Sequence, residues 1–245
     1  MQKQVIFTLD DGYLDNYTHA YKIFKKHNVP FTIYITASFP ERQAVLWWYI
    51  LEEIILNNRI VELSSGKFDC GSLESKNKVF LQIREMIISL DGINFMEDLN
   101  KMFYKYPIDW YKQCEEKCMS WEQILELSKD NLVTIGGHTL NHLALNKLPK
   151  ENIISEIVEA NLIIEKMIGK KVNHFGYPLG SRREIGLREF EIVKSLNMKT
   201  CTTTRRGNIY YKHLNYLYAL PRIMLTENFD LSEITRIRKN RIVEV

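Results

Sequence analysis

Short runs of β-branched and aromatic residues alternate with amphipathic segments along much of the chain. Residues 5–9 form an apolar, β-prone run, residues 15–27 carry apolar positions at helical spacing, and residues 31–36 are aromatic and β-branched. A strand, a helix and a second strand within about 35 residues predict a right-handed βαβ unit, and therefore a parallel sheet.

The same alternation returns in the second half of the chain. We expect strands at residues 132–135, 174–176, 200–203 and 218–220, and helices directly after Ser120 and at residues 151–168, 185–196 and 231–239. This pattern is typical of an α/β fold, as either a barrel or a doubly wound sheet.

Residues 38–119 interrupt this alternation. Helices are expected at residues 46–57, 76–90 and 95–104, and a small hairpin at residues 60–63 and 67–69. No linker rich in glycine, serine or proline borders this block. We therefore expect a single domain over residues 1–245, with a mostly helical insertion at residues 40–118.

Composition and charge narrow the class of protein. The chain has 245 residues, is 45% hydrophobic and carries a net charge of +3, which is typical of a globular protein with a sizeable core. The charges are mixed, so the sequence does not indicate nucleic-acid binding, which needs a clustered basic patch. No apolar run approaches the length of about 18 residues that a membrane span needs.

Two further features concern the cellular compartment. No apolar leader precedes the first strand, which favours a cytoplasmic location. The four cysteines do not suggest a disulfide framework. Cys114 and Cys118 lack the C-x-x-C spacing of structural zinc sites, so a metal role for this pair is the weaker interpretation.

Two adjacent carboxylates end the first expected strand. Asp10 and Asp11 precede Gly12, which allows a sharp turn. Because successive strand residues alternate sides, the two carboxylates should point in different directions. In α/β proteins this end of a strand is where chemistry usually occurs, and a surface turn is the alternative.

Two histidines follow the strand expected at residues 132–135. His138 and His142 are four positions apart, so on a helical turn both imidazoles would project from one face. That spacing is common in metal sites, although a surface position is the alternative. A catalytic metal needs a third ligand and open positions for water and substrate, and Asp11 is the natural supplier.

Three motifs occur in the order known from one enzyme family. T-L-D-D-G at residues 8–12 resembles T-F-D-D-G, H-T-L-N-H at 138–142 resembles H-[S/T]-x-x-H, and F-G-Y-P-L-G at 175–180 resembles the form F-x-Y-P-x-G. Matching context lies at residues 30–34, 120–123 and 220–223. Over nearly its whole length, the chain resembles the polysaccharide deacetylases (carbohydrate esterase family 4, the NodB homology domain).

This resemblance implies a fold, a cofactor and a reaction. The fold would be a distorted (β/α) barrel of about seven parallel strands. Asp11, His138 and His142 would bind one divalent metal ion, zinc before cobalt or nickel. Asp10 would be the general base for a metal-bound water, whose acidity the ion increases. The backbone N–H of Leu179 would stabilise the oxyanion.

Two elements of the family's active site are missing from the motifs. Many members carry an arginine that orients the base at the position of Gly176, and we hypothesise that Arg222 reaches Asp10 instead. The Leu-x-His motif of the general acid is not evident, which leaves His174 and His213 as candidates. A buried, hydrogen-bonded residue is the alternative for His174, and an exposed loop residue for His213.

The expected substrate is an N-acetylated sugar of a polysaccharide or glycan precursor in bacterial cell-surface polysaccharide assembly. Candidate substrate-binding residues are Tyr177, Pro178, Trp47 and Trp48, and packing against the barrel is the favoured alternative for the tryptophans. Two other functions remain open: hydrolysis of an O-acetyl ester or non-sugar amide, and a catalytically degenerate module that binds carbohydrate or a partner.

Overall fold

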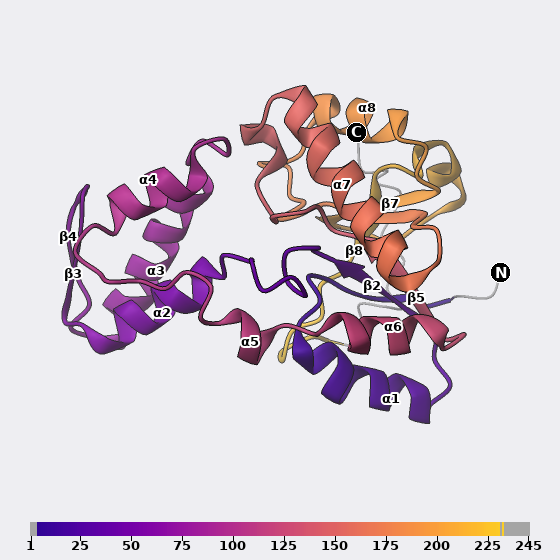
Figure 1. Ribbon diagram of the computed structural model, residues 1–245, viewed down its shortest axis with the longest axis horizontal. Helices are drawn as coiled ribbons and strands as arrows, with labels where there is room; N and C mark the ends of the chain where they lie inside the picture. The colour runs from indigo at the N-terminus through magenta and orange to yellow at the C-terminus, as the bar shows by residue number, and fades with distance from the viewer. Residues whose placement is uncertain (1–3, 231, 233–245) are drawn as a thin grey trace.

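A curled parallel sheet forms the body of the molecule (Figure 1). The computed structural model describes residues 4–230 and 232. Its main sheet has six strands in the order β1-β2-β5-β6-β7-β8, and all neighbours are parallel. The strands are β1 (Phe7–Leu9), β2 (Phe31–Ile35), β5 (Val133–Gly137), β6 (His174–Gly176), β7 (Thr200–Arg206) and β8 (Leu220–Arg222). The α/β class and the distorted barrel are confirmed, with six strands in the described residues where about seven were expected.

Helices pack around this sheet. They are α1 (Tyr21–Lys26), α6 (Trp121–Lys129), α7 (Lys150–Ile168) and α8 (Leu187–Ser195). Ile33 of β2, Ile135 of β5 and Ile164 of α7 belong to one buried cluster, and Phe175 and Phe190 belong to a second. None of the described helices combines the length and the apolar character needed to cross a bilayer.

Local sequence sets several helix ends. Ser120 and Gln123 form a capping box, in which each side chain accepts a hydrogen bond from the other's backbone N–H. A similar box at Ser72 starts α3 (Leu73–Ile88) three residues earlier than expected. Gly169 ends α7 in the left-handed conformation, with a φ of 69°.

Other elements differ from the sequence expectation. The helix expected at residues 15–27 consists of the π-helical η1 (Asn16–Ala20) followed by α1. The last strand lies at Leu220–Arg222 and not at residues 218–220, and it contains Pro221 because an edge strand tolerates a missing N–H. The helix expected at residues 231–239 lies outside the described residues.

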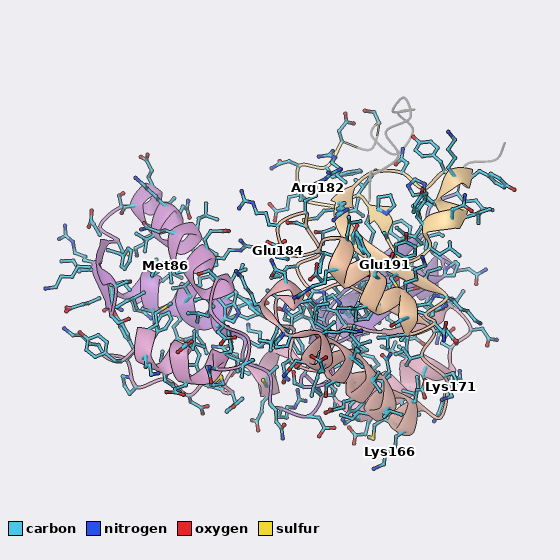
Figure 2. All side chains as sticks on the ribbon, turned by 90° about the horizontal axis from the view of Figure 1, so that it is seen from above. Met86, Lys166, Lys171, Arg182, Glu184 and Glu191 are labelled. Atoms are coloured by element: carbon cyan, nitrogen blue, oxygen red, sulfur yellow. The ribbon has the colours of Figure 1, made fainter. Side chains whose placement is uncertain are left out.

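A helical lobe stands beside the barrel. It contains α2 (Trp47–Asn57), the antiparallel hairpin of β3 (Ile60–Leu63) and β4 (Gly66–Asp69), α3 and α4 (Phe95–Met102). It has its own buried cluster, which includes Leu51, Ile83 and Leu99. Figure 2 shows the lobe, marked by Met86, to one side of the body that carries Lys166 and Glu191. Its description as an insertion within one domain stays a prediction.

Candidate metal centre

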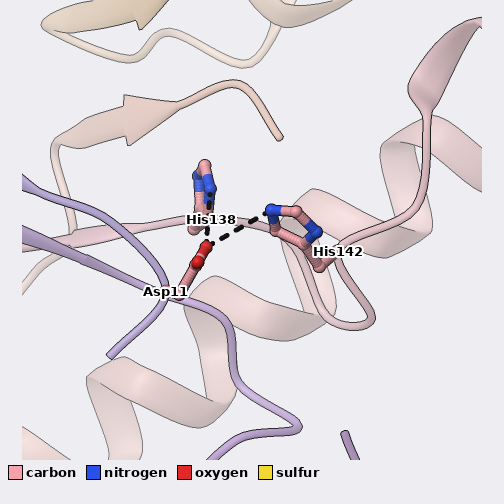
Figure 3. Close-up of side chains that lie close together, drawn as sticks. All are labelled: Asp11, His138 and His142. Carbon is pink, nitrogen blue, oxygen red and sulfur yellow. Dashed lines mark ion pairs between the residues drawn. The ribbon is translucent and has the colours of Figure 1, made fainter. Parts of the chain in front are cut away.

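Three potential ligands converge at the carboxyl edge of the sheet (Figure 3). Asp11 follows β1, His138 follows β5, and His142 lies in the loop beyond. The Oδ1 atom of Asp11 is 3.2 Å from Nε2 of His138 and 3.3 Å from Nε2 of His142. Within the described part of the chain, these three form the one group of histidine, cysteine and acidic side chains close enough to share an ion.

The two histidines do not lie on a helical turn, so that part of the expectation is wrong. Thr139 and His142 have positive φ angles of 65° and 57°, which an α-helix does not contain. The irregular turn nevertheless aims both rings at Asp11, which itself has a φ of 76°. Non-glycine residues in this region are strained, and such strain concentrates at functional sites.

Glu156 of α7 holds this turn in place. Its Oε2 accepts hydrogen bonds from the backbone N–H groups of Leu140 (3.1 Å) and Asn141 (2.9 Å), and its Oε1 accepts one from the Asn141 side chain (2.6 Å). The sequence analysis missed Glu156, although a buried-face acid in an amphipathic helix is a signal of such a role.

The donor atoms suit a divalent metal. Ligands about 2.0–2.1 Å from a tetrahedral zinc ion are about 3.3 Å from each other, which matches the measured separations of 3.2 and 3.3 Å. The Oδ1 of Asp11 is buried and has no hydrogen bond of normal geometry. Nδ1 of His138 lies 2.6 Å from the carbonyl of Gly176, so Nδ1–H donates to that oxygen and Nε2 is left as a lone-pair donor.

The charges of these groups depend on one another. Burial favours a raised pKa for Asp11, but His142, His138 and Arg222 hold the pKa below its ordinary value. Burial lowers the pKa of His142 and so favours its neutral, ligating form. Burial opposes the charged form of His138 as well, yet Asp11 and Asp10 raise its pKa.

Asp10 lies beside this group and is bound by Arg222. Nη1 of Arg222 is 2.7 Å from Oδ1 of Asp10, and Nη2 is 2.7 Å from Oδ2, which is a bidentate pair. Arg222 also donates to the carbonyl of Thr203 (2.9 Å) and to Oγ1 of Thr8 (3.0 Å). The structure thus brings Asp10 and Arg222 together, and the base-orienting role stays a prediction.

Gly176 leaves little room for a side chain in the third motif. A Cβ atom there would lie 3.0 Å from Nδ1 of His138 and 3.0 Å from the ring of Tyr34. The guanidinium of Arg222 lies over that same ring, 5.7 Å from its centroid. A cation therefore reaches Asp10 from β8 and not from the third motif.

Leu179 lies in a tight turn after β6. Its φ is 59°, and its carbonyl accepts a 2.6 Å hydrogen bond from the hydroxyl of Thr204. Leu179 and one proposed metal ligand, His142, line the same cavity. The role of its N–H stays a prediction.

The third motif's side chains do not fit the expected contact with substrate. Tyr177 is fully buried, and its hydroxyl donates to the carbonyl of Tyr218 at 2.9 Å. Pro178 is buried as well. Both side chains pack in the protein interior, which corrects the sequence expectation.

Neither histidine proposed as the general acid has the expected setting. His174 lies at the amino end of β6, whereas the ligands lie beyond the carboxyl ends of β1 and β5, and its Nδ1 is 2.7 Å from Oγ1 of Thr200. His213 is 2% exposed, and its Nδ1 accepts from the N–H of Tyr210 at 3.0 Å. His213 is therefore not an exposed loop residue, and the position of His174 argues against an acid role.

The two tryptophans differ in their surroundings. Trp47 is buried in the core of the lobe. Trp48 is half-buried and places its ring 5.7 Å from that of His142, in an edge contact. The ring of Tyr49, the next residue of α2, contacts that of Tyr13 with centroids 6.1 Å apart, and the sequence analysis missed Tyr13, which lies two positions after Asp11. The helical lobe therefore contributes directly to the wall of the site.

A parallel barrel with an Asp–His–His group at its carboxyl edge defines an α/β barrel protein with a candidate metal site. The sequence profile described as "Polysaccharide deacetylase" matches residues 1–200. The chain therefore belongs to the polysaccharide deacetylase family. Comparison with curated proteins gives no match.

Solved structures share the fold at low sequence identity. The Streptococcus pyogenes deacetylase PplD in complex with acetate is similar with a TM-score of 0.57 and 18% identity, covering 93% of this chain and 67% of that one. A de-N-acetylase from Aggregatibacter actinomycetemcomitans is similar with a TM-score of 0.53 and 15% identity, covering 94% of this chain and 73% of that one. IcaB from Ammonifex degensii is similar with a TM-score of 0.53 and 18% identity, covering 91% of this chain and 68% of that one.

Proposed function

We propose that this protein is a metal-dependent hydrolase that removes the N-acetyl group from an amino sugar of a glycan. The observation that carries the proposal is the pairing of two features. Asp11, His138 and His142 converge with spacings suited to one ion, and Asp10 stands beside them as a separate carboxylate. A divalent ion bound there would polarise the acyl carbonyl and increase the acidity of water.

Residues of the chain would then transfer the protons and stabilise the developing negative charge. Asp10 would accept the proton of the attacking water, since Arg222 fixes the direction of its carboxylate through two hydrogen bonds. The backbone N–H of Leu179 would donate to the oxygen that becomes negative. Asp10 would afterwards hold the proton that the leaving amine needs.

The substrate class follows from the family and the relatives. The family is named for polysaccharide deacetylation, and one similar structure is described as a de-N-acetylase, which favours an amide over an ester. Two imidazoles and a carboxylate favour zinc. We extend the proposal to a glycan of the bacterial cell surface. The cytoplasmic location expected from the sequence stays a prediction.

Metal content of the purified protein tests the site. We expect near-stoichiometric zinc, cobalt or nickel in the wild type and none in the His138→Ala, His142→Ala double variant. His174→Ala is the matched control and should retain the metal, because His174 lies at the other end of β6.

Acetate release from chitin oligomers and other N-acetylated glycans tests the reaction. Asp10→Asn should keep the metal and lose activity, since Asn cannot accept the proton. Stoichiometric metal with no acetate release from any N-acetylated glycan would favour the alternative, a binding module. Absence of metal binding would remove the mechanism.

A further inference from the structure

An apolar cavity lies between the helical lobe and the loop that carries His142. Trp48, Ile87, Ile88 and Phe95 line it from the lobe, and His142, Ala144 and Leu179 line it from the barrel. Its volume is ≈ 30 Å³. The polar lining residues Asn141 and Lys147 are exposed.

Contacts beside the cavity hold the lobe against the barrel. Gly92 packs so closely on Leu148 that a Cβ atom at Gly92 would lie 2.6 Å from the leucine Cδ2. An exposed ion pair also joins lobe and barrel, with Nη1 of Arg183 3.4 Å from Oε2 of Glu85. The cavity therefore lies at a junction where lobe and barrel are in contact.

The cavity adjoins two residues of the proposed reaction centre. It is bordered by both a proposed metal ligand, His142, and the proposed oxyanion donor, Leu179. Asp10 and Arg222 are not among its lining residues. An acyl carbon held between His142 and Leu179 would therefore have this cavity beside it.

Size and polarity decide which substituent fits. One water-sized group needs about 10–15 Å³ on this measure, so a cavity of ≈ 30 Å³ admits two or three such groups and excludes a sugar ring. Burying sugar hydroxyls among apolar side chains without partners would also be costly. The amine side of the substrate carries the sugar, so the acyl side is the one that fits.

We propose that this cavity is an acyl-chain site, and that the enzyme takes N-acyl groups of two to four carbons and not acetyl alone. The inference rests on the proposed function and adds the class of acyl group. The helical lobe then selects the acyl chain, since it supplies most of the cavity's large apolar side chains.

Binding of the carboxylate products to the zinc-loaded, full-length protein tests this proposal without knowledge of the sugar. Acetate, propionate, butyrate and hexanoate are titrated, and dissociation constants are taken from thermal shifts and calorimetry. We expect affinity to rise about fourfold with each added methylene up to butyrate, the value for burying one CH₂, and to fall for hexanoate.

Two variants test where the acyl chain binds. Ile88→Ala should move the optimum toward hexanoate, because it removes three carbons from the cavity wall. Met86→Ala, in the same helix but outside the lining, should leave the series unchanged. Hydrolysis of N-acetyl, N-propionyl and N-butyryl chitin oligomers should follow the same order as the product affinities.

The outcomes separate the two proposals. Affinity that is flat or decreasing from acetate to butyrate, together with acetate release from N-acetyl oligomers, would overturn the acyl-chain site and leave the proposed function intact. An unchanged optimum in Ile88→Ala would also overturn it. A rising series in a protein that releases no acyl group would support the cavity's affinity for acyl chains and contradict the proposed reaction.

Discussion

Arg222 is the residue whose contacts bear most directly on catalysis. Its two Nη atoms lie 2.7 Å from the two oxygens of Asp10, so Arg222→Ala should lower kcat by about 100-fold or more through loss of an oriented base. Arg222→Lys should be intermediate, because an ammonium cannot form the bidentate pair. Metal content should not change, since Arg222 contacts none of the three ligands through a hydrogen bond. Steady-state kinetics near those of the wild type in Arg222→Ala would contradict the hypothesis that Arg222 orients Asp10.

Glu156 should stabilise the turn between the two histidines. Glu156→Ala leaves the N–H groups of Leu140 and Asn141 without their acceptor, at a cost of about 2 kcal/mol in the free energy of unfolding. It should also weaken metal binding. Glu156→Gln keeps one oxygen that can accept from the N–H groups of Leu140 and Asn141. Its new amide NH₂ can donate to the side-chain oxygen of Asn141 once the Asn141 amide has turned over. Glu159→Ala, at an exposed position of the same helix, is the control.

The stability difference between wild type and Glu156→Gln should depend on pH. Burial raises the pKa of Glu156 above its ordinary value, so the folded state binds a proton more tightly than the unfolded state. The free energy of unfolding of the wild type relative to Glu156→Gln is therefore highest below the unfolded-state pKa of Glu156. It falls as pH rises through the raised folded-state pKa. Denaturant unfolding of both proteins between about pH 4 and pH 7 measures it. A difference that grows with pH would contradict this sign.

Residues in compact motifs were predictable from sequence, and those defined by distant contacts were not. The convergence of Asp11, His138 and His142 follows from motifs at the ends of parallel strands, which share one edge of the sheet. The burial of Tyr177 does not follow from its motif, because its hydroxyl partner, the carbonyl of Tyr218, lies on another segment. Glu156 was missed for the same reason.

The strands around the site pack too closely to admit added atoms. A Cβ atom at Gly136 of β5 would lie 2.5 Å from Tyr34 Cδ1 of β2 and 2.8 Å from the carbonyl of His174 in β6. Gly136→Ala should therefore lower the free energy of unfolding by about 1–3 kcal/mol, the cost of overpacking, and should reduce metal affinity through displacement of β5. Gly71→Ala, at an exposed turn, is the control; equal unfolding midpoints of the two variants would contradict the prediction.

Element existence was more predictable than element ends. The alternation of apolar and polar residues located the strands of the main sheet, the β3–β4 hairpin and the long helices. The start of α3 was misplaced because its Ser72–Ser75 capping box was not recognised. The strand through Pro221 depends on its place at the sheet edge, and periodicity reports neither that place nor the break between η1 and α1.

At the scale of the whole molecule, the lobe and the barrel have separate cores. The lobe cluster contains Leu51, Ile83 and Leu99, and the barrel clusters contain none of these residues. The sequence located this block by the interruption of the βα alternation. It gave no sign that Trp48 would contact His142, because that contact joins the lobe to a loop after β5.

Separate cores predict separate responses to a cavity in the lobe. Ile83 is fully buried in the lobe, so Ile83→Ala should cost about 2–5 kcal/mol of stability locally. Hydrogen exchange should accelerate in α2, α3 and α4 and remain slow in β2 and β5. Zinc stoichiometry should persist, since all three ligands lie outside the lobe, while the binding of butyrate should weaken relative to acetate.

Ile164→Ala in the barrel core is the matched comparison and should reduce zinc binding as well. Uniformly accelerated exchange in Ile83→Ala would show instead that lobe and barrel unfold as one cooperative unit, and the division into a barrel with an insertion would then have no energetic meaning.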